Sequence, residues 1–193
     1  GRGPVSFVFR QKPYTILIND VACFPQSYAA AVTILPTLQN EHRALVLDIG
    51  GFTADYLQLR NGEGNLAVCD SLESGVISLY NKIISKVNAE HDMLLDEEEI
   101  DAILLKQKSP PVPDIGRIVE RQAQDFINDL FSTLRERGLE LKTGKVVFVG
   151  GGSILLRRQI LASGKIGSAL FVEDVRANAK GYELLYQAVS GGR

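Results

Sequence analysis

Cysteine and histidine are scarce in this chain, and their scarcity excludes the common metal and redox sites. Two cysteines, Cys23 and Cys69, and two histidines occur among 193 residues. The cysteines do not form a CxxC pair, and no His/Cys cluster has the spacing of metal ligands. A zinc site and a paired-thiol redox centre are therefore not expected. Both thiols are expected to be buried and reduced, because free cysteine behaves as a small apolar residue.

The sequence also lacks long apolar runs and a strong excess of one charge. No run reaches the roughly 18 apolar residues that a membrane span needs, and no signal peptide opens the chain. We therefore expect a cytoplasmic protein without a membrane partner. The formal net charge of -2 gives no basic face for nucleic acid, so any role with DNA would pass through another protein. The opening Gly-Arg-Gly-Pro lacks methionine, which favours an excised piece of a longer protein.

The apolar pattern predicts an α/β protein. Hydrophobic residues make up 45% of the chain and charged residues 23%, which is enough apolar surface for a folded core. Strands are expected as two runs within residues 5–24 around a turn at 11–13, and at 44–49, 53–60, 66–72, 145–149 and 169–174. Helical spacing predicts helices over 28–38, 76–87, 95–106, 115–137, 154–161 and 176–189. The three strands between 44 and 72 suggest an antiparallel meander, and the last two βα units suggest neighbouring parallel strands.

The octet at 48–55, Asp-Ile-Gly-Gly-Phe-Thr-Ala-Asp, carries the first candidate site. A buried strand delivers Asp48 to the edge of a sheet, and Gly50 and Gly51 then allow a tight turn. Without side chains, the amide N–H groups of these glycines can approach an anion closely, and Thr53 adds a hydroxyl donor. A carboxylate beside such a nest suits Mg²⁺ held through waters. The alternative is a plain β-hairpin whose aspartate caps its own turn.

A second glycine segment, Val149-Gly-Gly-Gly-Ser153, joins a predicted strand to a predicted helix. Helix N-terminal amides could meet a phosphate there, and bare glycines would leave room for a base or ribose. A dinucleotide-binding fingerprint is the rival, because Gly150, Gly152 and the later Glu173 fit part of it. Leu155 stands where the third glycine belongs, and this rival gives the octet no task.

The two sites, in this order and separated by a helical block, resemble the actin/DnaK/sugar-kinase ATPase superfamily. Within it, the sequence is most similar to the ParM/StbA plasmid-partition actins over nearly the whole chain. The similar segments are YTILINDVACFPQS, ALVLDIGGFTAD, CDSLESGVISLYNKI, VVFVGGGSILL and LFVEDVRANAKGYELLYQAV. The resemblance implies an α/β fold of the actin/DnaK (ribonuclease H-like) type, a mixed sheet with flanking helices and a small helical insert.

The resemblance also implies roles for single residues, with ATP and Mg²⁺ as cofactors. Asp48 matches the acid near the Mg²⁺ shell, and Gln26 stands where the family places a Glu or Gln that orients the attacking water. Glutamine is no strong base, so its role would be orientation. Gly75 matches a glycine near the ribose. The remaining matches are Gly50, Gly51 and Thr53 in the second phosphate loop, and Gly150, Gly151, Gly152 and Ser153 in the adenosine loop.

Three segments follow from the same resemblance. Residues 1–40 would be the tail of the first domain with its crossover helix. Residues 41–75 and 143–193 would form the second large subdomain, and 76–142 its helical insert. The family's first phosphate loop is absent, so the isolated chain is expected to bind ATP weakly and to hydrolyse it negligibly.

The function implied is that of an ATPase whose filaments segregate plasmid DNA through a DNA-binding adaptor protein. A metabolic sugar kinase or a chaperone-type ATPase of the same superfamily is the alternative, since neither assembles into filaments. A binding module with a vestigial nucleotide site is a third possibility. The intact octet argues against this third reading, because a decayed site has no reason to keep Asp48 beside two glycines.

Overall fold

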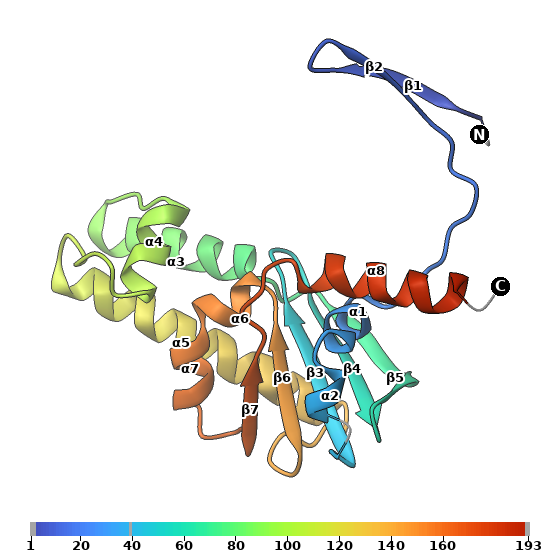
Figure 1. Ribbon diagram of the computed structural model, residues 1–193. Helices are drawn as coiled ribbons and strands as arrows, with labels where there is room; N and C mark the ends of the chain where they lie inside the picture. The colour runs from blue at the N-terminus through green and yellow to red at the C-terminus, as the bar shows by residue number, and fades with distance from the viewer. Residues whose placement is uncertain (1–2, 39, 192–193) are drawn as a thin grey trace.

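A five-stranded mixed sheet organises the chain in the computed structural model, which describes residues 3–38 and 40–191 (Figure 1). The strand order is β5-β4-β3-β6-β7. The strands are β3 (Arg43–Ile49), β4 (Ala54–Arg60), β5 (Glu63–Leu72), β6 (Lys145–Val149) and β7 (Ser168–Phe171). β3, β4 and β5 form an antiparallel meander, whereas β6 pairs parallel to β3 and β7 parallel to β6. The predicted meander and the predicted parallel pair are both confirmed.

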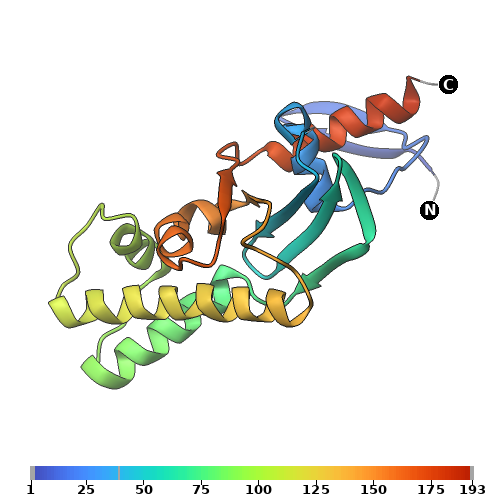
Figure 2. The same ribbon diagram turned by 90° about the horizontal axis from the view of Figure 1, so that it is seen from below.

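Helices cover both faces of this sheet, as Figure 2 shows with α5 on one side and α8 on the other. One face carries α1 (Gln26–Val32), α2 (Leu35–Leu38) and α8 (Ala177–Ser190). The other face carries α3 (Val76–His91), α5 (Pro113–Glu136) and α7 (Arg157–Ala162). Two further helices, α4 (Glu97–Leu104) and α6 (Gly151–Leu155), complete the fold. The result is an α/β domain with a helical layer on each side of the sheet.

Side-chain alternation along β3 decides which residue meets which helical layer. Leu45 and Leu47 enter the core that contains the residues of α3 and α5. Ala44 and Val46 point the other way and pack in the core that contains Ala30 of α1. Residue 48 has the same parity as 44 and 46. Its side chain therefore faces α1 and α8.

Local signals explain where α4 and α5 begin and where α5 ends. Asp96 caps α4: its carboxylate accepts the Glu99 amide N–H at 2.7 Å, and the Glu99 carboxylate accepts the Asp96 N–H at 3.2 Å. This reciprocal arrangement satisfies two amides that have no partner inside the helix. Pro113 opens α5, where its missing N–H costs nothing. Gly138 follows the end of α5 with φ +79°, a conformation that glycine adopts without strain.

Two predicted helices are each divided in two. The segment 28–38 forms α1 and α2, because Pro36 lacks the amide that a continuous helix would use. Placing Pro36 in the first turn of a new helix removes that conflict. The segment 154–161 breaks at Leu156, whose backbone leaves the helical conformation while its side chain is fully buried. Its first part starts three residues earlier than predicted, at Gly151.

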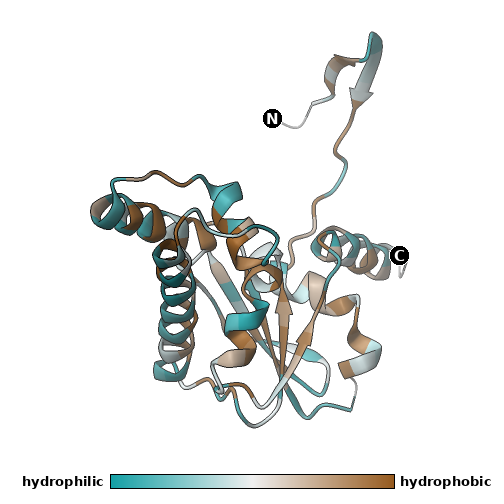
Figure 3. Cartoon of the chain, turned by 90° about the vertical axis from the view of Figure 1, so that its left-hand side faces the viewer, coloured by the Kyte–Doolittle hydropathy of each residue, from teal (hydrophilic) through white to brown (hydrophobic). Residues whose placement is uncertain are grey.

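The hairpin formed by β1 (Val5–Phe9) and β2 (Lys12–Ile16) lies away from the rest of the molecule (Figure 1). Every residue of both strands is exposed. The turn falls on Arg10 and Gln11, which have positive φ. It lies earlier than the predicted turn at 11–13, because Lys12 and Pro13 pair with residues of β1. Figure 3 shows the extended linker that joins the hairpin to α1.

The prediction of buried cysteines is wrong, because both thiols are exposed. Cys23 lies in the extended segment before α1, where little chain packs around it. Cys69 lies on β5, an edge strand whose residues are mostly exposed. Within the described part of the chain, no helix is both long and apolar enough to span a membrane.

Candidate functional site

Asp48 is the buried centre of the site, with 1% of its surface exposed. Its Oδ2 accepts two amide hydrogen bonds, one from Gln26 Nε2 at 3.0 Å and one from Asn178 Nδ2 at 2.8 Å. Gln26 opens α1 and Asn178 lies in the first turn of α8, so two helices from one layer hold one carboxylate oxygen. Hydrogen bonding to both partners offsets part of the cost of burying this group.

The turn between β3 and β4 places backbone donors at the surface. The Gly50 N–H donates to the Thr53 carbonyl at 2.9 Å, which closes the turn, and the Thr53 hydroxyl donates to Asp55 Oδ2 at 3.1 Å. Gly51 and Phe52 at its tip are exposed. Among the described residues, neither of these two N–H groups has an acceptor. Adjacent unpaired amides of this kind form a cradle for an anion.

The N-terminus of α3 docks directly beneath this turn. Its first amides, those of Gly75, Val76 and Ile77, donate to the carbonyls of residues 52, 50 and 51 at 3.1, 3.0 and 2.9 Å. A Cβ on Gly75 would overlap the Gly51 carbonyl, so only glycine allows this approach. The turn's carbonyls are thereby occupied, and the positive end of the α3 dipole lies under its free N–H groups.

The glycine segment after β6 packs against the same place. Gly150 has φ +85°, and a Cβ there would overlap Asp48 Oδ1. A Cβ on Gly152 would lie 2.7 Å from Ile49 Cγ2 and 2.7 Å from Val76 Cγ1. These two glycines therefore let protein elements meet, which corrects the expectation that they leave room for a ligand. Gly151 is the one of the three with open space around its Cα.

Ser153 also has a structural task in this segment. Its side chain is fully buried, and its hydroxyl donates to the Val149 carbonyl at 2.5 Å. Its backbone N–H donates to the Gly150 carbonyl at 3.2 Å. Ser153 therefore shapes the turn, and no donor of this residue is left free for a ligand.

Glu173, the acidic residue of the alternative dinucleotide-binding motif, is not placed to bind a ribose. Glu173 Oε1 accepts Arg157 Nη1 at 2.7 Å on the surface, and the Arg157 guanidinium stacks on the Phe171 ring with 4.7 Å to its centroid. This carboxylate is thus engaged in an ion pair on the α7 side of the sheet. It does not serve a ribose beside the glycine segment.

The charge of the site extends to α8. Burial raises the pKa of Tyr182, and the negative charges of Asp48 and Asp55 raise it further. No group of three or more His, Cys, Asp or Glu side chains in the described ranges could enclose a metal ion. One carboxylate fits Mg²⁺ nevertheless, since this ion keeps several waters and is commonly bound through one or two carboxylates and a phosphate.

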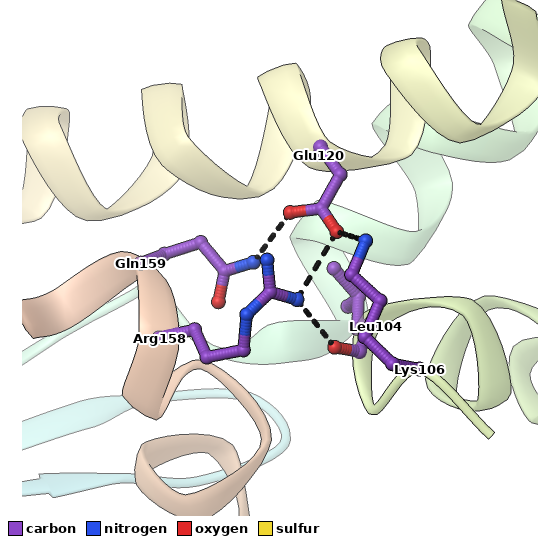
Figure 4. Close-up of polar contacts among 5 residues, drawn as sticks. All are labelled: Leu104, Lys106, Glu120, Arg158 and Gln159. Carbon is purple, nitrogen blue, oxygen red and sulfur yellow. Dashed lines mark hydrogen bonds and ion pairs between the residues drawn. The ribbon is translucent and has the colours of Figure 1, made fainter. Parts of the chain in front are cut away.

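A second polar cluster joins α4, α5 and α7 on the other face (Figure 4). Glu120 Oε1 accepts Lys106 Nζ at 2.5 Å and Arg158 Nη1 at 3.2 Å, and its Oε2 accepts Gln159 Nε2 at 2.9 Å. Arg158 also donates to the Leu104 carbonyl at 3.1 Å. Burial raises the pKa of Glu120, but the bonds from Lys106 and Arg158 outweigh burial and hold the pKa below its usual value. Sequence spacing gave no sign of this cluster.

The structure places Asp48, Gln26 and the glycine segments named from the sequence next to one another, but sequence reasoning missed Asn178. The residue stands 130 positions after Asp48. A weak signal existed, because Asn178 falls in the first turn of the last predicted helix (176–189) and Gln26 stands two residues before the first predicted helix (28–38). Only the placement of both helices on one face turns that signal into a contact.

Comparison with known protein families shows to which family the chain belongs. The family described as "Archaeal actin homologue MreB-like, C-terminal" matches residues 46–161, more than half of the chain. The chain belongs to this family. The matched segment begins within β3 and ends within α7, so this actin homologue carries both glycine elements and Asp48 inside the family region.

Solved structures agree on the fold of this actin homologue. The archaeal actin homolog Ta0583 in complex with ADP matches with a TM-score of 0.71 and 21% identity, covering 97% of this chain and 64% of that chain. The Alp12 filament structure matches with a TM-score of 0.65 and 16% identity, covering 98% and 60%. ParM of Bacillus thuringiensis with ATP matches with a TM-score of 0.62 and 14% identity, covering 94% and 58%.

These matches establish an actin-like α/β fold. This actin homologue spans 60–64% of the length of Ta0583 in the three matching structures of that protein. No curated protein matches the sequence.

Proposed function

We propose that this chain is the C-terminal, nucleotide-binding part of an actin-like ATPase. One observation carries the proposal: the β3–β4 turn, the start of α3 and the glycine segment after β6 meet beside the buried carboxylate of Asp48. Free backbone donors, a helix N-terminus and one carboxylate are the features that a magnesium nucleotide requires. The complex of Ta0583 with ADP supports this choice of ligand by analogy of fold.

Each part of the site has a proposed task. Gly50, Gly51 and Thr53 bind the terminal phosphates through the turn, and Gly75 lies at the ribose. The segment from Gly150 to Ser153 borders the adenosine, with Gly151 as its open point. Asp48 holds Mg²⁺ through waters. The ion, when bound, neutralises the charge that develops on the phosphates during hydrolysis.

Gln26 is proposed to orient the attacking water. It is exposed and stands at the first position of α1, next to Asp48. An amide cannot take a proton from water efficiently, so its contribution is alignment of the nucleophile. Turnover by such a site is slow unless a second element completes it.

We also propose that the chain contains three segments. Residues 1–40 are the tail of the first domain with its crossover helix, 41–75 and 143–193 the second large subdomain, and 76–142 the helical insert. The first phosphate loop is expected in the remaining part of the longer protein. On this basis the 193-residue chain binds ATP weakly and hydrolyses it negligibly. Calorimetry that gave micromolar or tighter binding would contradict this point.

The finer proposal is that the longer protein forms nucleotide-dependent filaments that move plasmid DNA. The sequence resemblance to ParM/StbA actins and the likeness of fold to Alp12 and ParM support it. Heterologous contacts between copies do not close on themselves and therefore generate filaments. A net charge of -2 disfavours direct binding of DNA, so a DNA-binding adaptor protein is expected.

Sedimentation of the longer protein tests the proposal. Wild type is expected in the pellet with Mg²⁺ and ATP and in the supernatant with ADP. Asp48→Ala is expected to pellet with ATP and to fail to release, because hydrolysis is lost. Turnover of ATP without any pellet would overturn the filament proposal and favour a kinase-like or chaperone-like ATPase. Absence of both turnover and binding would overturn the nucleotide site itself.

A further inference from the structure

Asn178 is a polar residue at the site to which the proposed function gives no role. Its Nδ2 donates to Asp48 Oδ2 at 2.8 Å, on the same oxygen that accepts Gln26 Nε2 at 3.0 Å. We propose that Asn178 is a positioning residue, which holds the Asp48 carboxylate throughout nucleotide binding and hydrolysis. Gln26 is the partner that breaks its hydrogen bond to Asp48 in order to contact the attacking water. The role of Gln26 in this inference rests on the proposed function, whereas the role of Asn178 does not.

The surroundings of the two side-chain amides differ as a fixed Asn178 and a movable Gln26 would require. Gln26 is exposed, has a long side chain and opens a helix of 7 residues. Asn178 is half-buried, has one fewer methylene and belongs to a helix of 14 residues. Its neighbour Ala177 is 2% exposed, and Gly181 one turn later lies against the backbone of Ala29. Asn178 is therefore held by the packing around it, whereas the exposed Gln26 side chain has solvent on one side into which it can turn when its bond to Asp48 breaks.

The orientation of the Asn178 amide is determined by Asp48. A flipped amide would place its Oδ1 against the carboxylate oxygen, which is two acceptors in contact. The observed orientation leaves Oδ1 buried and without a hydrogen-bond partner among the described residues. A buried acceptor without a donor lowers the stability of the fold. The contribution of Asn178 is therefore the hydrogen bond from its Nδ2 to Asp48, and not a general gain in stability.

Different losses follow from substitution at the two positions. Without Asn178, Asp48 keeps only a mobile partner, so affinity for a magnesium nucleotide falls. Without Gln26, Asp48 stays in place and affinity persists, whereas turnover falls. A merely structural role of Asn178 would lower stability instead and leave the site's geometry intact in the folded fraction.

The first test uses the 193-residue chain without nucleotide. In ¹H–¹⁵N spectra, the side-chain NH₂ groups of Asn178 and Gln26 are followed in wild type, Asp48→Ala and Asn178→Ala. Asp48→Ala is expected to shift both NH₂ pairs, and Asn178→Ala to shift that of Gln26. If Asp48→Ala leaves the Asn178 NH₂ signals unshifted, the inference is overturned, independently of any result with nucleotide.

The second test adds Mg²⁺ with ADP or with a non-hydrolysable ATP analogue to the same chain. Gln26 resonances are expected to move between the two nucleotides, and those of Asn178 to keep their position. Equal movement of both would overturn the division of tasks. A wild-type spectrum that does not change at millimolar nucleotide would instead contradict the proposed function, and the first test would still decide the role of Asn178.

The third test compares variants for affinity and stability. Asn178→Ala is expected to weaken binding of Mg²⁺-ADP about tenfold, the effect of losing one charge-assisted hydrogen bond. Asn178→Asp should weaken it further, because a second carboxylate then faces Asp48. Gln187→Glu makes the same amide-to-acid change at an exposed position of α8 and should leave affinity unchanged. Asn178→Ser serves as the milder replacement if Asn178→Asp does not fold.

Melting curves of these variants complete the comparison. Asn178→Ala is expected to melt within roughly 4 °C of wild type, which corresponds to about 1–2 kcal/mol for a chain of this size. Loss of affinity in a chain that remains folded supports positioning. Unchanged affinity with a strongly lowered melting temperature would overturn it.

Discussion

Gly75 and Gly151 both belong to the glycine-containing segments of the site, but their surroundings differ. A Cβ on Gly75 would overlap the Gly51 carbonyl, whereas a Cβ on Gly151 would meet nothing within 4 Å. Gly75→Ala is therefore expected to lower the free energy of unfolding by about 3 kcal/mol, because backbone must move. Gly151→Ala should change it by less than about 1 kcal/mol. Urea denaturation of the two variants measures both effects, and similar losses would show that the packing at Gly75 is looser than described.

Glu120 gives a dependence of stability on pH. Its folded-state pKa is lowered, so its contribution is present above the pKa of the unfolded chain, about 4.3, and is lost as pH falls through the folded value. Glu120→Gln should cost about 1–2 kcal/mol of unfolding free energy at pH 7, since Lys106 and Arg158 lose a charged acceptor. The difference between wild type and variant should shrink below pH 4.

Glu136→Gln is the matched control for this measurement. Glu136 lies at the end of the same helix, is exposed and forms no ion pair within the described part of the chain. Its substitution should change the unfolding free energy by less than about 0.5 kcal/mol at any pH. A difference for Glu120→Gln that did not depend on pH would mean that shape, not charge, holds the cluster together.

At the level of single residues, the sequence predicted side chains whose neighbours come from a local motif. Asp48 and the turn glycines stand in one octet, and their positions at the end of β3 follow from the pattern of strand and turn residues. Asn178 could not be predicted, because its contact depends on two helices sharing one face. Gly152 was predicted as open space, but the space is filled by Ile49 and Val76, which no local pattern places there.

The crossing of α1 and α8 is the tightest helix contact at the site. A Cβ on Gly181 would overlap the backbone of Ala29, so the two helices touch without side chains between them. Gly181→Ala should push them apart and cost about 3 kcal/mol or more of unfolding free energy. Ser190→Thr also adds one methyl group to α8, at an exposed position, and should cost less than about 0.5 kcal/mol.

A structural readout accompanies this prediction. Because Asn178 lies one turn before Gly181, separation of the helices should lengthen its bond to Asp48 and shift its NH₂ resonances. A stable Gly181→Ala variant with an unchanged spectrum would contradict the close crossing. All five strands of the sheet were predicted; β3 and β6, whose apolar runs are continuous, match within one residue, whereas β5 begins three residues before the predicted start and β7 ends three residues before the predicted end. The helices over 28–38 and 154–161 were each predicted as one helix and not two, because apolar spacing persists through a break.

The whole molecule consists of a packed α/β body and a separate hairpin. All residues of β1 and β2 are exposed, including Phe7 and Phe9. A chain that begins at Ala22 should therefore keep the unfolding free energy of the full chain within about 0.5 kcal/mol, with the same slope of free energy against denaturant concentration. It should also be more soluble, because exposed apolar strands promote association. A loss above about 1 kcal/mol would mean that the hairpin packs on the body in solution.

The architecture of the body was predictable from the order of its elements. A meander followed by two βα units allows few sheets, and the observed strand order is one of them. The separation of the hairpin was not predictable, because its alternating apolar residues look like any strand that packs on a core. Which helices share a face depends on the path of the connections, and spacing along the chain does not encode it.

The distance along the chain between Asp48 and Asn178 has a consequence during translation. The two residues are 130 positions apart, so at synthesis rates of about 5–20 residues per second the second emerges roughly 6–26 s after the first. A nascent chain thus exposes β3 and its carboxylate before the partner that completes the site exists. We expect nucleotide binding to reach its full strength only after α8 has left the ribosome.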